Sequence, residues 1–389
     1  MEKKRIKTNS WLLVFYLYLH SILVPFNYFL NENRLANLEM LMLISLSIYV
    51  LLINREIIKV KMLVLYFFLL SFFLLNVLIV EYKQYVYPVI VMMVISSFLP
   101  VFLLGTRKIN FEYILSYWFK MARFLSYFYV PILFLLRSNK IIGYFEVAQF
   151  VHLNSIILFY YLIVKEKKDI FTVLLLILNF LMLLTMGSRM VLIATVTTFA
   201  VIILFLNRKN RRSYFLYSGL FCGIGLIAFL YVEDILVFIL GVLSKHGIPS
   251  RNILLLLQYV QGTEIKELSS GRDYIYPIAK ELVSKGQGLP QGLGVIRNAT
   301  SGQYYHAHNI FFEMTITFGF IFFALFITWW IFKTYLLYKY NKKNAVFSFF
   351  IIISIPYFIR ALVGTYFLTD SFFLVAFSIL FWLERKEVT

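Results

Sequence analysis

The chain has 389 residues, of which 61% are hydrophobic and only 14% are charged. A soluble globular domain is about 45–50% apolar and about 25% charged, so this composition excludes a soluble enzyme, a disordered protein and a disulfide scaffold. The net charge of +18 comes from short basic clusters between apolar stretches. That pattern is typical of the cytoplasmic loops of a membrane protein, and no nucleic-acid partner is expected.

Continuous apolar stretches follow one another along the chain, and each approaches the roughly 20 residues of a membrane-spanning helix. We therefore predict an all-α integral membrane protein and not an outer-membrane barrel, whose strands span only ~10 residues each. Because no small-residue cleavage site follows the first stretch, we expect a retained helix and not a signal peptide. Twelve spans are predicted, near 10–30, 35–53, 62–80, 85–105, 117–136, 148–164, 170–188, 190–206, 213–232, 307–332, 344–360 and 365–383.

The basic residues between these stretches predict the orientation. With the N-terminus in the cytoplasm, the cytoplasmic segments hold about 21 Lys and Arg residues, and the short loops on the other side hold about six. Since basic residues favour the cytoplasmic side, both termini are predicted to be cytoplasmic. The chain then divides into spans one to nine (1–232), a large extracytoplasmic loop (233–306), and spans ten to twelve with a cytoplasmic tail (307–389).

The large loop is long enough to be functional rather than a simple connection. Two amphipathic stretches, Ile235–Leu243 and Ile253–Val260, favour short helices in the membrane interface. The segment Ser269-Ser270-Gly271-Arg272-Asp273-Tyr274 is predicted to open a further helix that runs through about Val283. The glycine- and proline-rich segment over 286–294 predicts a succession of turns. In the fifth stretch, Lys120 and Arg123 indicate an interfacial helix that leads into the span.

A few polar residues at the predicted outer face could carry chemistry. Arg189 lies in a tight turn between two spans, where an arginine can also simply reach lipid headgroups. Arg272 follows a Ser-Ser-Gly turn, where its simplest role is that of a solvated surface charge. His306 and His308 end the large loop, and Glu313 lies one helical turn after Asn309 on the same predicted face.

These residue types favour transfer from a phosphate-linked lipid. Arginine binds phosphate oxygens in a bidentate manner, and histidine accepts a proton near neutral pH. The chain has no Gly-x-x-x-x-Gly-Lys motif, so ATP is not expected as a substrate. A metal site at His306, His308 and Glu313 is the alternative. A His-x-His pair is weak support for it, and no spaced carboxylate pair accompanies it in the outer loops.

The order of these motifs resembles that of the O-antigen ligase and oligosaccharide repeat-unit polymerase superfamily. Its members have a large outer loop late in the chain. They carry a Ser-Arg pair in mid-chain, a Gly-Arg pair and a Pro-x-Gly-x-Gly segment in the loop, and Ala-His-Asn entering a helix. The similar segments here are Ser188-Arg189, Gly271-Arg272, Pro290-Gln-Gly292-Leu-Gly294 and Ala307-His308-Asn309.

Three positions depart from the family pattern. Phe322 stands where the ligase form of the His-Asn motif ends in glycine, threonine or tyrosine. The family's Arg-x-x-x-Trp segment is altered, with Tyr274 and Tyr276 as the nearest aromatic residues. An Asn-Pro-Asn element is similar only to His152-Leu153-Asn154, which lacks the proline.

The resemblance implies a GT-C-like glycosyltransferase in the bacterial cytoplasmic membrane. It would transfer a glycan from undecaprenyl pyrophosphate to a hydroxyl of another lipid-linked repeat unit, with inversion, and so polymerise O-antigen or capsule. Arg189 and Arg272 would bind the pyrophosphate, and His308 would be the general base. Asn309 and Glu313 are further candidate substrate-binding residues. No metal and no cofactor are implied, and the implied partners are membrane lipid and a chain-length regulator.

Two alternatives remain open at this stage. A ligase of the same superfamily would use a sugar of the lipid A core as acceptor. A non-enzymatic flippase of lipid-linked oligosaccharides would show inverted repeats and polar residues near the bilayer midplane. Here the predicted spans are mostly apolar apart from residues such as His20, Asn76 and Asn179, which favours an enzyme at the outer face.

Overall fold

The computed structural model is all-helical, with no strand among the residues that it describes. It describes residues 2–382 except 25, 27–29, 31, 59, 130, 133–143, 167–168, 187, 207–210, 248–250, 263–270 and 365. Helices are expected for such apolar stretches, because a helix satisfies its backbone hydrogen bonds within the segment and needs no water. The predicted cytoplasmic tail after the twelfth stretch, 383–389, lies outside the described residues, as does part of the large loop.

The chain forms two compact units. The first contains Met1–Leu17, Met40–Ile114 and Ser269–Thr389, and the second contains Tyr18–Glu39 and Leu115–Leu268. Three helices pass from one unit to the other: α1 (Glu2–Leu23), α2 (Glu32–Asn54) and α5 (Phe111–Leu125). Each unit is described by itself below.

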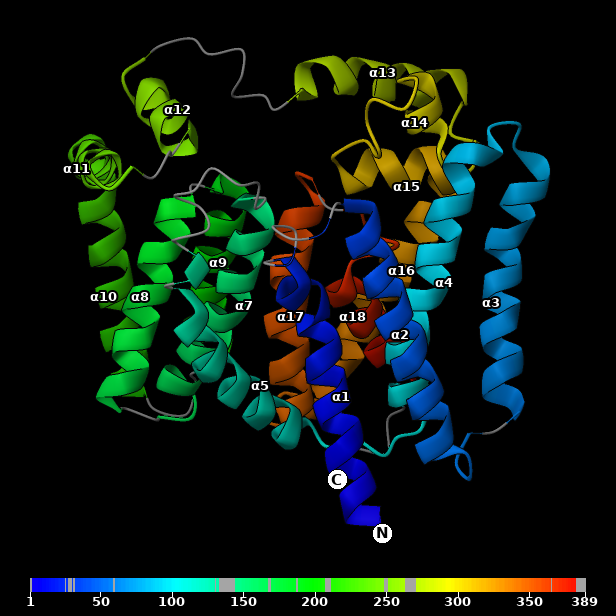
Figure 1. Cartoon of the computed structure of the whole chain (residues 1–389), viewed down its shortest axis with the longest axis horizontal. Coiled ribbons are helices and arrows are strands. Elements are labelled where there is room, and N and C mark those ends of the chain that lie inside the picture. Colours follow the sequence, from blue (N-terminus) through cyan, green and yellow to red (C-terminus); the bar gives the residue numbers. More distant parts are fainter. Residues whose placement is uncertain are drawn as a thin grey trace. The chain divides into compact units, whose positions relative to one another are not determined.

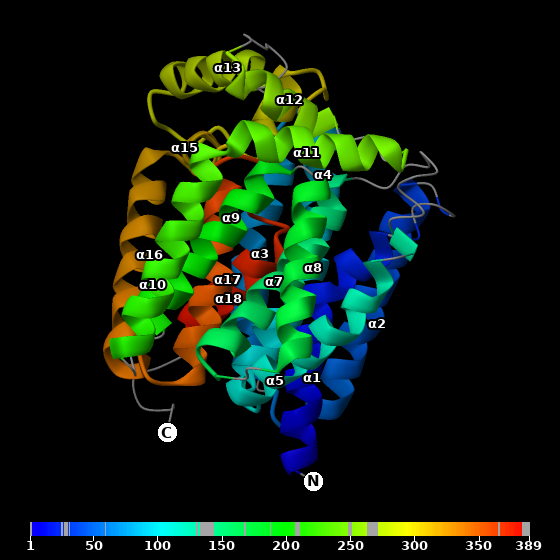
Figure 2. The ribbon, with the colours of Figure 1, turned by 90° about the vertical axis from the view of Figure 1, so that its left-hand side faces the viewer.

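The first unit contains long helices whose ends are covered on one side by short ones. In both views, α13 and α15 lie across one end of α4 and α16 (Figures 1 and 2), and Figure 1 shows α14 next to them. Five buried residues, Ile275, Ala279, Ile296, Ala307 and Ile316, form an apolar core under these short helices. The other helices of this unit are α3 (Val60–Ile79), α4 (Lys83–Gly105), α13 (Arg272–Lys285), α14 (Val295–Ala299), α15 (Ile310–Phe318), α16 (Phe320–Asn341), α17 (Ala345–Ala361) and α18 (Ser371–Trp382).

The second unit has the same kind of organisation. Short helices α11 (Val232–Lys245) and α12 (Arg251–Val260) pack against each other through Leu236, Leu243 and Ile253. They lie across one end of α8 and α10 (Figure 2). The longer helices of this unit are α7 (Tyr144–Ile163), α8 (Ile170–Met186), α9 (Arg189–Val201) with a π-helical extension over Ile202–Leu206, and α10 (Arg211–Leu230).

The helices predicted within the large loop are confirmed. Both amphipathic stretches are helical, as α11 and α12, and α13 begins at Arg272, within the segment over 269–274 that was predicted to open a helix. On α13, Glu281 and Lys285 form an i, i+4 ion pair, with Glu281 Oε1 at 2.6 Å from Lys285 Nζ. The segment over 286–294 contains no helix and is followed directly by α14.

Some predicted spans differ from the structure. The fifth was predicted over 117–136, but α5 begins earlier, at Phe111, and a 3-10 helix over Ser126–Phe128 follows it, while 133–136 lie outside the described residues. The tenth was predicted as one helix over 307–332, but Gly319 divides it into α15 and α16. Gly319 has φ 84°, and a Cβ there would lie 3.0 Å from the Gly288 carbonyl oxygen. Glu313 therefore belongs to the short helix α15, and His308 to the turn before it, and neither lies in one long helix.

Among the residues that the structure describes, five helices are long and apolar enough to cross a membrane, or six if the bent pair formed by α10 and α11 counts as one span. Shorter apolar helices of 10–17 residues lie at Met62–Leu75, Ile170–Met186, Ala345–Ala361 and Ser371–Trp382. An all-helical protein with membrane-spanning potential is therefore observed. The count of twelve spans stays a prediction.

Candidate functional site

The candidate site of the first unit includes the turn at Gly271, which leads into α13. Gly271 precedes α13 with φ 80°, in the left-handed region that glycine adopts easily. A Cβ at this position would clash with the hydroxyl oxygen of Tyr304. Both the backbone conformation and the space therefore require glycine, and this turn places Arg272 as the first residue of the helix.

The Arg272 guanidinium uses only part of its hydrogen-bonding capacity. Its Nη2 donates a hydrogen bond to the carbonyl oxygen of Val363, at 2.6 Å. Its Nε is buried and has no hydrogen-bond partner among the described residues. A buried N–H without a partner is costly, and an arginine side chain has five N–H donors that suit an anion. Arg272 is therefore fixed in place while part of its donor capacity stays unused.

The turn over 306–309 carries the two histidines. Nδ1 of His306 accepts a hydrogen bond from the backbone N–H of His308, at 3.1 Å. Oε2 of Glu313 accepts one from the N–H of Ala307, at 2.7 Å. Asn309 caps α15, since its Oδ1 accepts hydrogen bonds from the backbone N–H groups of the next turn. The side chains of His306, Asn309 and Glu313 thus accept hydrogen bonds from four backbone N–H groups of this turn and the start of α15.

His308 has φ 52°, in the left-handed region that residues other than glycine rarely adopt. Such conformations are kept only where the surroundings impose them, and they cluster at functional sites. The two histidine rings lie close together, with centroids 4.3 Å apart. Because Nδ1 of His306 is an acceptor, the neutral ring of His306 carries its proton on Nε2.

Burial keeps both histidines neutral. It lowers the pKa of His306 to about 3, with a smaller effect from the neighbouring His308. Burial also lowers the pKa of His308, and the positive charge of Arg272 lowers it further. At neutral pH, His308 is therefore a neutral imidazole next to a cation, which is the state that can accept a proton.

Glu313 is buried, and burial raises its pKa to about 7, although the hydrogen bond from the Ala307 N–H opposes this shift. The carboxyl group is therefore close to half ionised at neutral pH. Within the described residues, no three His, Cys, Asp or Glu side chains are grouped as metal ligands. The structure assigns Glu313 to the support of the histidine turn, and a role in binding substrate stays a prediction.

A buried ion pair supports the same site from the connection between α17 and α18. Arg360 Nη2 lies 2.9 Å from Asp370 Oδ2, and both side chains are 5% exposed. Asp370 also accepts backbone hydrogen bonds that cap the start of α18. The carbonyl oxygen of Arg360 accepts a hydrogen bond from Val363 N–H, at 3.1 Å. This pair therefore fixes the turn whose Val363 carbonyl holds Arg272.

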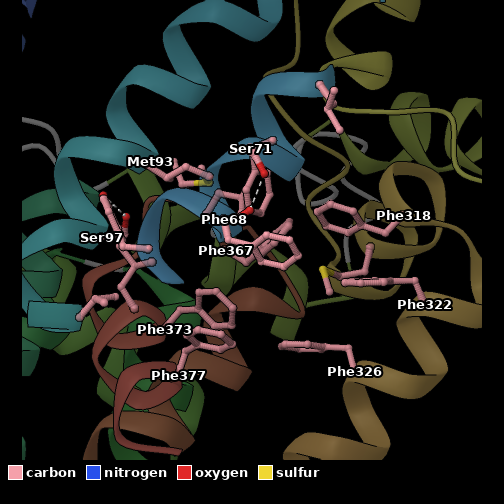
Figure 3. A pocket seen from close by; sticks show the side chains of 18 residues that line it. Phe68, Ser71, Met93, Ser97, Phe318, Phe322, Phe326, Phe367, Phe373 and Phe377 are labelled. Carbon is pink, nitrogen blue, oxygen red and sulfur yellow. Dashed lines mark hydrogen bonds between the residues drawn. The ribbon is translucent and has the colours of Figure 1, made fainter. Parts of the chain in front are cut away.

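An apolar cavity of about 480 Å³ lies next to the histidine turn, between α3, α4, α15, α16 and α18. Figure 3 shows phenylalanine rings from several of these helices pointing into it. Met314 of its lining directly follows Glu313, and Phe367 directly follows Tyr366, whose ring stacks on His306 at 5.6 Å. The lining includes Phe68, Phe73, Met93, Met314, Phe318, Phe322, Phe326, Phe367, Phe373 and Phe377.

The few polar groups of the cavity lining are already satisfied. The Tyr66 hydroxyl donates to the Val94 carbonyl oxygen at 2.5 Å, and the Ser71 hydroxyl donates to the Phe68 carbonyl oxygen at 2.6 Å. Water in the cavity would thus find few partners, whereas a buried water usually makes about three hydrogen bonds. The cavity suits a hydrocarbon chain.

The structure brings together four of the five predicted site residues. Arg272 begins α13, His308 and Asn309 form the turn that leads into α15, and Glu313 lies on α15. Arg189 belongs to the second unit, where it is the first residue of α9 and directly follows Ser188. The tight turn that was predicted before it is consistent with the end of α8 at Met186.

Several supporting residues are not part of any motif. Tyr304 and Tyr305 adjoin His306 in the sequence and could have been found from that proximity. Asp370 could not, because nothing in its local sequence indicates that it pairs with Arg360. The cavity depends on side chains from five helices, and no local pattern predicts it.

No protein-family model matches the chain, and no curated protein is found to be similar to it. The resemblance to the polymerase and ligase superfamily therefore rests on the sequence motifs and the predicted topology.

Proposed function

We propose that the chain is an oligosaccharide repeat-unit polymerase. It would be a GT-C-like glycosyltransferase with twelve spans in the bacterial cytoplasmic membrane, with both termini cytoplasmic and the helices α11 to α15 at the outer face. One observation carries this proposal. The Arg272 guanidinium, with unused donor capacity, lies beside the neutral and conformationally constrained His308, next to an apolar cavity.

An amphiphilic donor fits this combination of features. The pyrophosphate of a lipid-linked glycan offers anionic oxygens, which match the free donors of the Arg272 guanidinium. Its isoprenoid chain matches the cavity beside α15, whose lining is almost wholly apolar. Arg189 is proposed as a second phosphate ligand on the basis of the family motif alone.

The reaction then follows from the protonation states. His308 takes the proton of an acceptor hydroxyl, and the hydroxyl oxygen attacks the anomeric carbon of the donor sugar. The bond between that carbon and the pyrophosphate oxygen breaks, and undecaprenyl pyrophosphate leaves with the bonding electron pair. Direct displacement inverts the anomeric configuration. Arg272 stabilises the charge that develops on the leaving group, as preorganised cations do in phosphoryl chemistry.

A reconstituted transfer reaction tests this proposal. The purified chain in detergent is incubated with undecaprenyl-pyrophosphate-linked repeat units, in EDTA and without nucleotide, and the products are separated by size. A ladder of lipid-linked oligomers is expected. A chain that makes no oligomer but moves the glycan to lipid A core would be a ligase. A strict requirement for Mg²⁺ or ATP would contradict the proposed mechanism.

A further inference from the structure

A continuous row of ring contacts passes through the histidine turn. The Tyr274 ring of α13 contacts Tyr304, with centroids 5.8 Å apart. Tyr304 contacts His308 at 6.1 Å, and His308 contacts His306 at 4.3 Å. His306 contacts Tyr305 at 6.3 Å, and the guanidinium of Arg297 lies over the Tyr305 ring at 4.9 Å. We name these six residues the aromatic strip: Tyr274, Tyr304, His308, His306, Tyr305 and Arg297.

The strip is open at its two ends and covered in its middle. Tyr274 is 52% exposed and Tyr305 is 40% exposed, whereas His306 is 9% exposed. The exposed tyrosines thus flank the His308 side chain, which is the proposed proton acceptor. Arg297 is held between the Tyr85 and Tyr305 rings, at 5.3 and 4.9 Å, so its guanidinium has a fixed position at one end of the strip.

The chemistry of the strip fits sugar rings better than other ligands. One face of a pyranose presents C–H groups, which match the electron-rich face of an aromatic ring. The hydroxyl groups at the rim of a sugar match the tyrosine hydroxyls and the guanidinium N–H groups. A hydrocarbon chain would instead favour the cavity beside α15, whose lining lacks free polar groups. Tyrosines that only anchor a protein at a membrane surface do not need to contact one another.

We propose that the aromatic strip is a glycan subsite, in which Tyr274 and Tyr305 stack against pyranose rings on either side of His308. This inference rests on the proposed function, because it assigns the sugar units of that substrate to particular residues. It places one sugar ring near Tyr274 and another near Tyr305, with the reacting hydroxyl between them at His308.

Binding of free oligosaccharide tests the strip without any turnover. The probe is a set of oligosaccharides of one to three repeat units, released by mild hydrolysis from the surface polysaccharide of the source cells. Saturation-transfer NMR and calorimetry measure their affinity for the detergent-solubilised chain. Tyr274→Ala and Tyr305→Ala are each expected to weaken binding about 2- to 10-fold, the range of a lost aromatic contact.

Matched variants keep the test sharp. Tyr259→Ala removes an exposed tyrosine of α12, outside the strip, and is expected to leave the affinity unchanged. Tyr274→Phe and Tyr305→Phe keep the ring and should retain most of the affinity, so they also control for misfolding. Wild-type affinity in both alanine variants, or no binding of any probe by the wild-type chain, would overturn the subsite.

The transfer assay tests the polymerase proposal, and the binding measurement tests the glycan subsite, so the two can fail independently. If the wild-type chain makes oligomers while the alanine variants bind the probe normally, the subsite is wrong and the proposed function stands. If the wild-type chain binds the probe through the strip but makes no oligomer, the subsite stands and the polymerase proposal is wrong.

Discussion

Two buried polar regions of this chain have different patterns of hydrogen bonding. In the first unit, the side chains of the turn over 306–309 bond mainly to backbone groups, and Arg272 keeps a buried Nε without a partner. In the second unit, Trp118, Tyr18, Asn154, Tyr129 and Asn179 bond to one another in a chain of side chains.

The second region saturates its own polar groups. Tyr18 donates to Asn154 Oδ1 at 2.6 Å, and Asn154 Nδ2 donates to the Tyr129 hydroxyl at 2.7 Å. Asn179 also donates to the Leu175 carbonyl oxygen at 2.6 Å. A network of this kind joins helices in a medium without water. The two regions therefore differ in one respect: the first combines a buried Arg272 Nε without a partner with the left-handed backbone of His308, whereas the second satisfies its polar groups among its own side chains.

The largest effect is expected at the reactive turn. His308→Ala removes the proposed proton acceptor, which should lower the transfer rate roughly 10²–10⁴-fold. The oligomerisation assay measures the rate, and thermal unfolding in detergent is measured in parallel. His306→Ala is the matched control and should lower the transfer rate less, because His306 supports the turn through its Nδ1 and is not the proposed proton acceptor. Equal rates for the wild type and His308→Ala would remove the basis for calling this region reactive.

Breaking the buried Arg360–Asp370 ion pair is expected to lower the free energy of unfolding strongly, although neither residue takes part in the proposed reaction. Asp370→Asn retains an oxygen that can cap α18 but leaves the Arg360 charge unpaired. Breaking a buried pair by changing one partner costs about 3–5 kcal/mol. Unfolding in detergent monitored by circular dichroism measures this loss. The exposed pair on α13 provides the control, since Glu281→Gln should have no measurable effect. Similar results for both variants would contradict this description of the buried pair.

Glu313 predicts a dependence of stability on pH. Its pKa is raised from an ordinary value near 4.5 to about 7 in the folded chain. The carboxyl group therefore contributes its full stability below about pH 4.5, where both states are protonated. That contribution is lost as the pH rises to about 7, and the loss is about 3 kcal/mol. Above pH 7, no further change is expected from this group.

The Glu313→Gln variant isolates this effect. His306 acts in the opposite direction, because its lowered pKa makes the folded state less stable as the pH falls below about 6.5. The difference between the wild type and Glu313→Gln in thermal unfolding, measured from pH 4.5 to 8, therefore reports Glu313 alone. A difference that does not change with pH would show that the carboxyl group titrates normally.

The smallest effect is expected in the second region. Asn154→Leu removes the hydrogen-bond partner of Tyr18 and Tyr129. Hydrogen bonds between membrane helices contribute about 1 kcal/mol each, so a modest loss of stability is expected. The transfer rate per folded molecule should stay unchanged. A rate that falls as far as in His308→Ala, at normal abundance, would show that this network takes part in the reaction.

The sequence predicted the parts of this molecule that depend on local pattern. Hydropathy located the apolar helices, and the segment over 269–274 indicated where α13 begins. The motif spacing indicated His308 and Asn309, but not that Asn309 caps α15. The break at Gly319 was missed because the apolar stretch continues through it. That break depends on contact with the Gly288 segment, which is distant in sequence.

Long-range partners explain the remaining differences. Arg272 is held by Val363, which lies 91 residues further along the chain. The Arg360–Asp370 pair and the cavity likewise depend on how α15 to α18 pack. No periodicity in the sequence specifies such pairs, since each residue alone fits an ordinary loop or helix end.

Complementation of a polymerase-null strain tests the central claim most directly. Arg272→Lys keeps the positive charge but loses the fork of the guanidinium, and His308→Ala loses the proton acceptor. We predict that both variants insert at wild-type abundance but fail to restore the ladder of surface-polysaccharide lengths, while the wild-type chain restores it. A normal ladder from both variants, at equal abundance, would contradict the assignment of this turn as the site of glycan transfer.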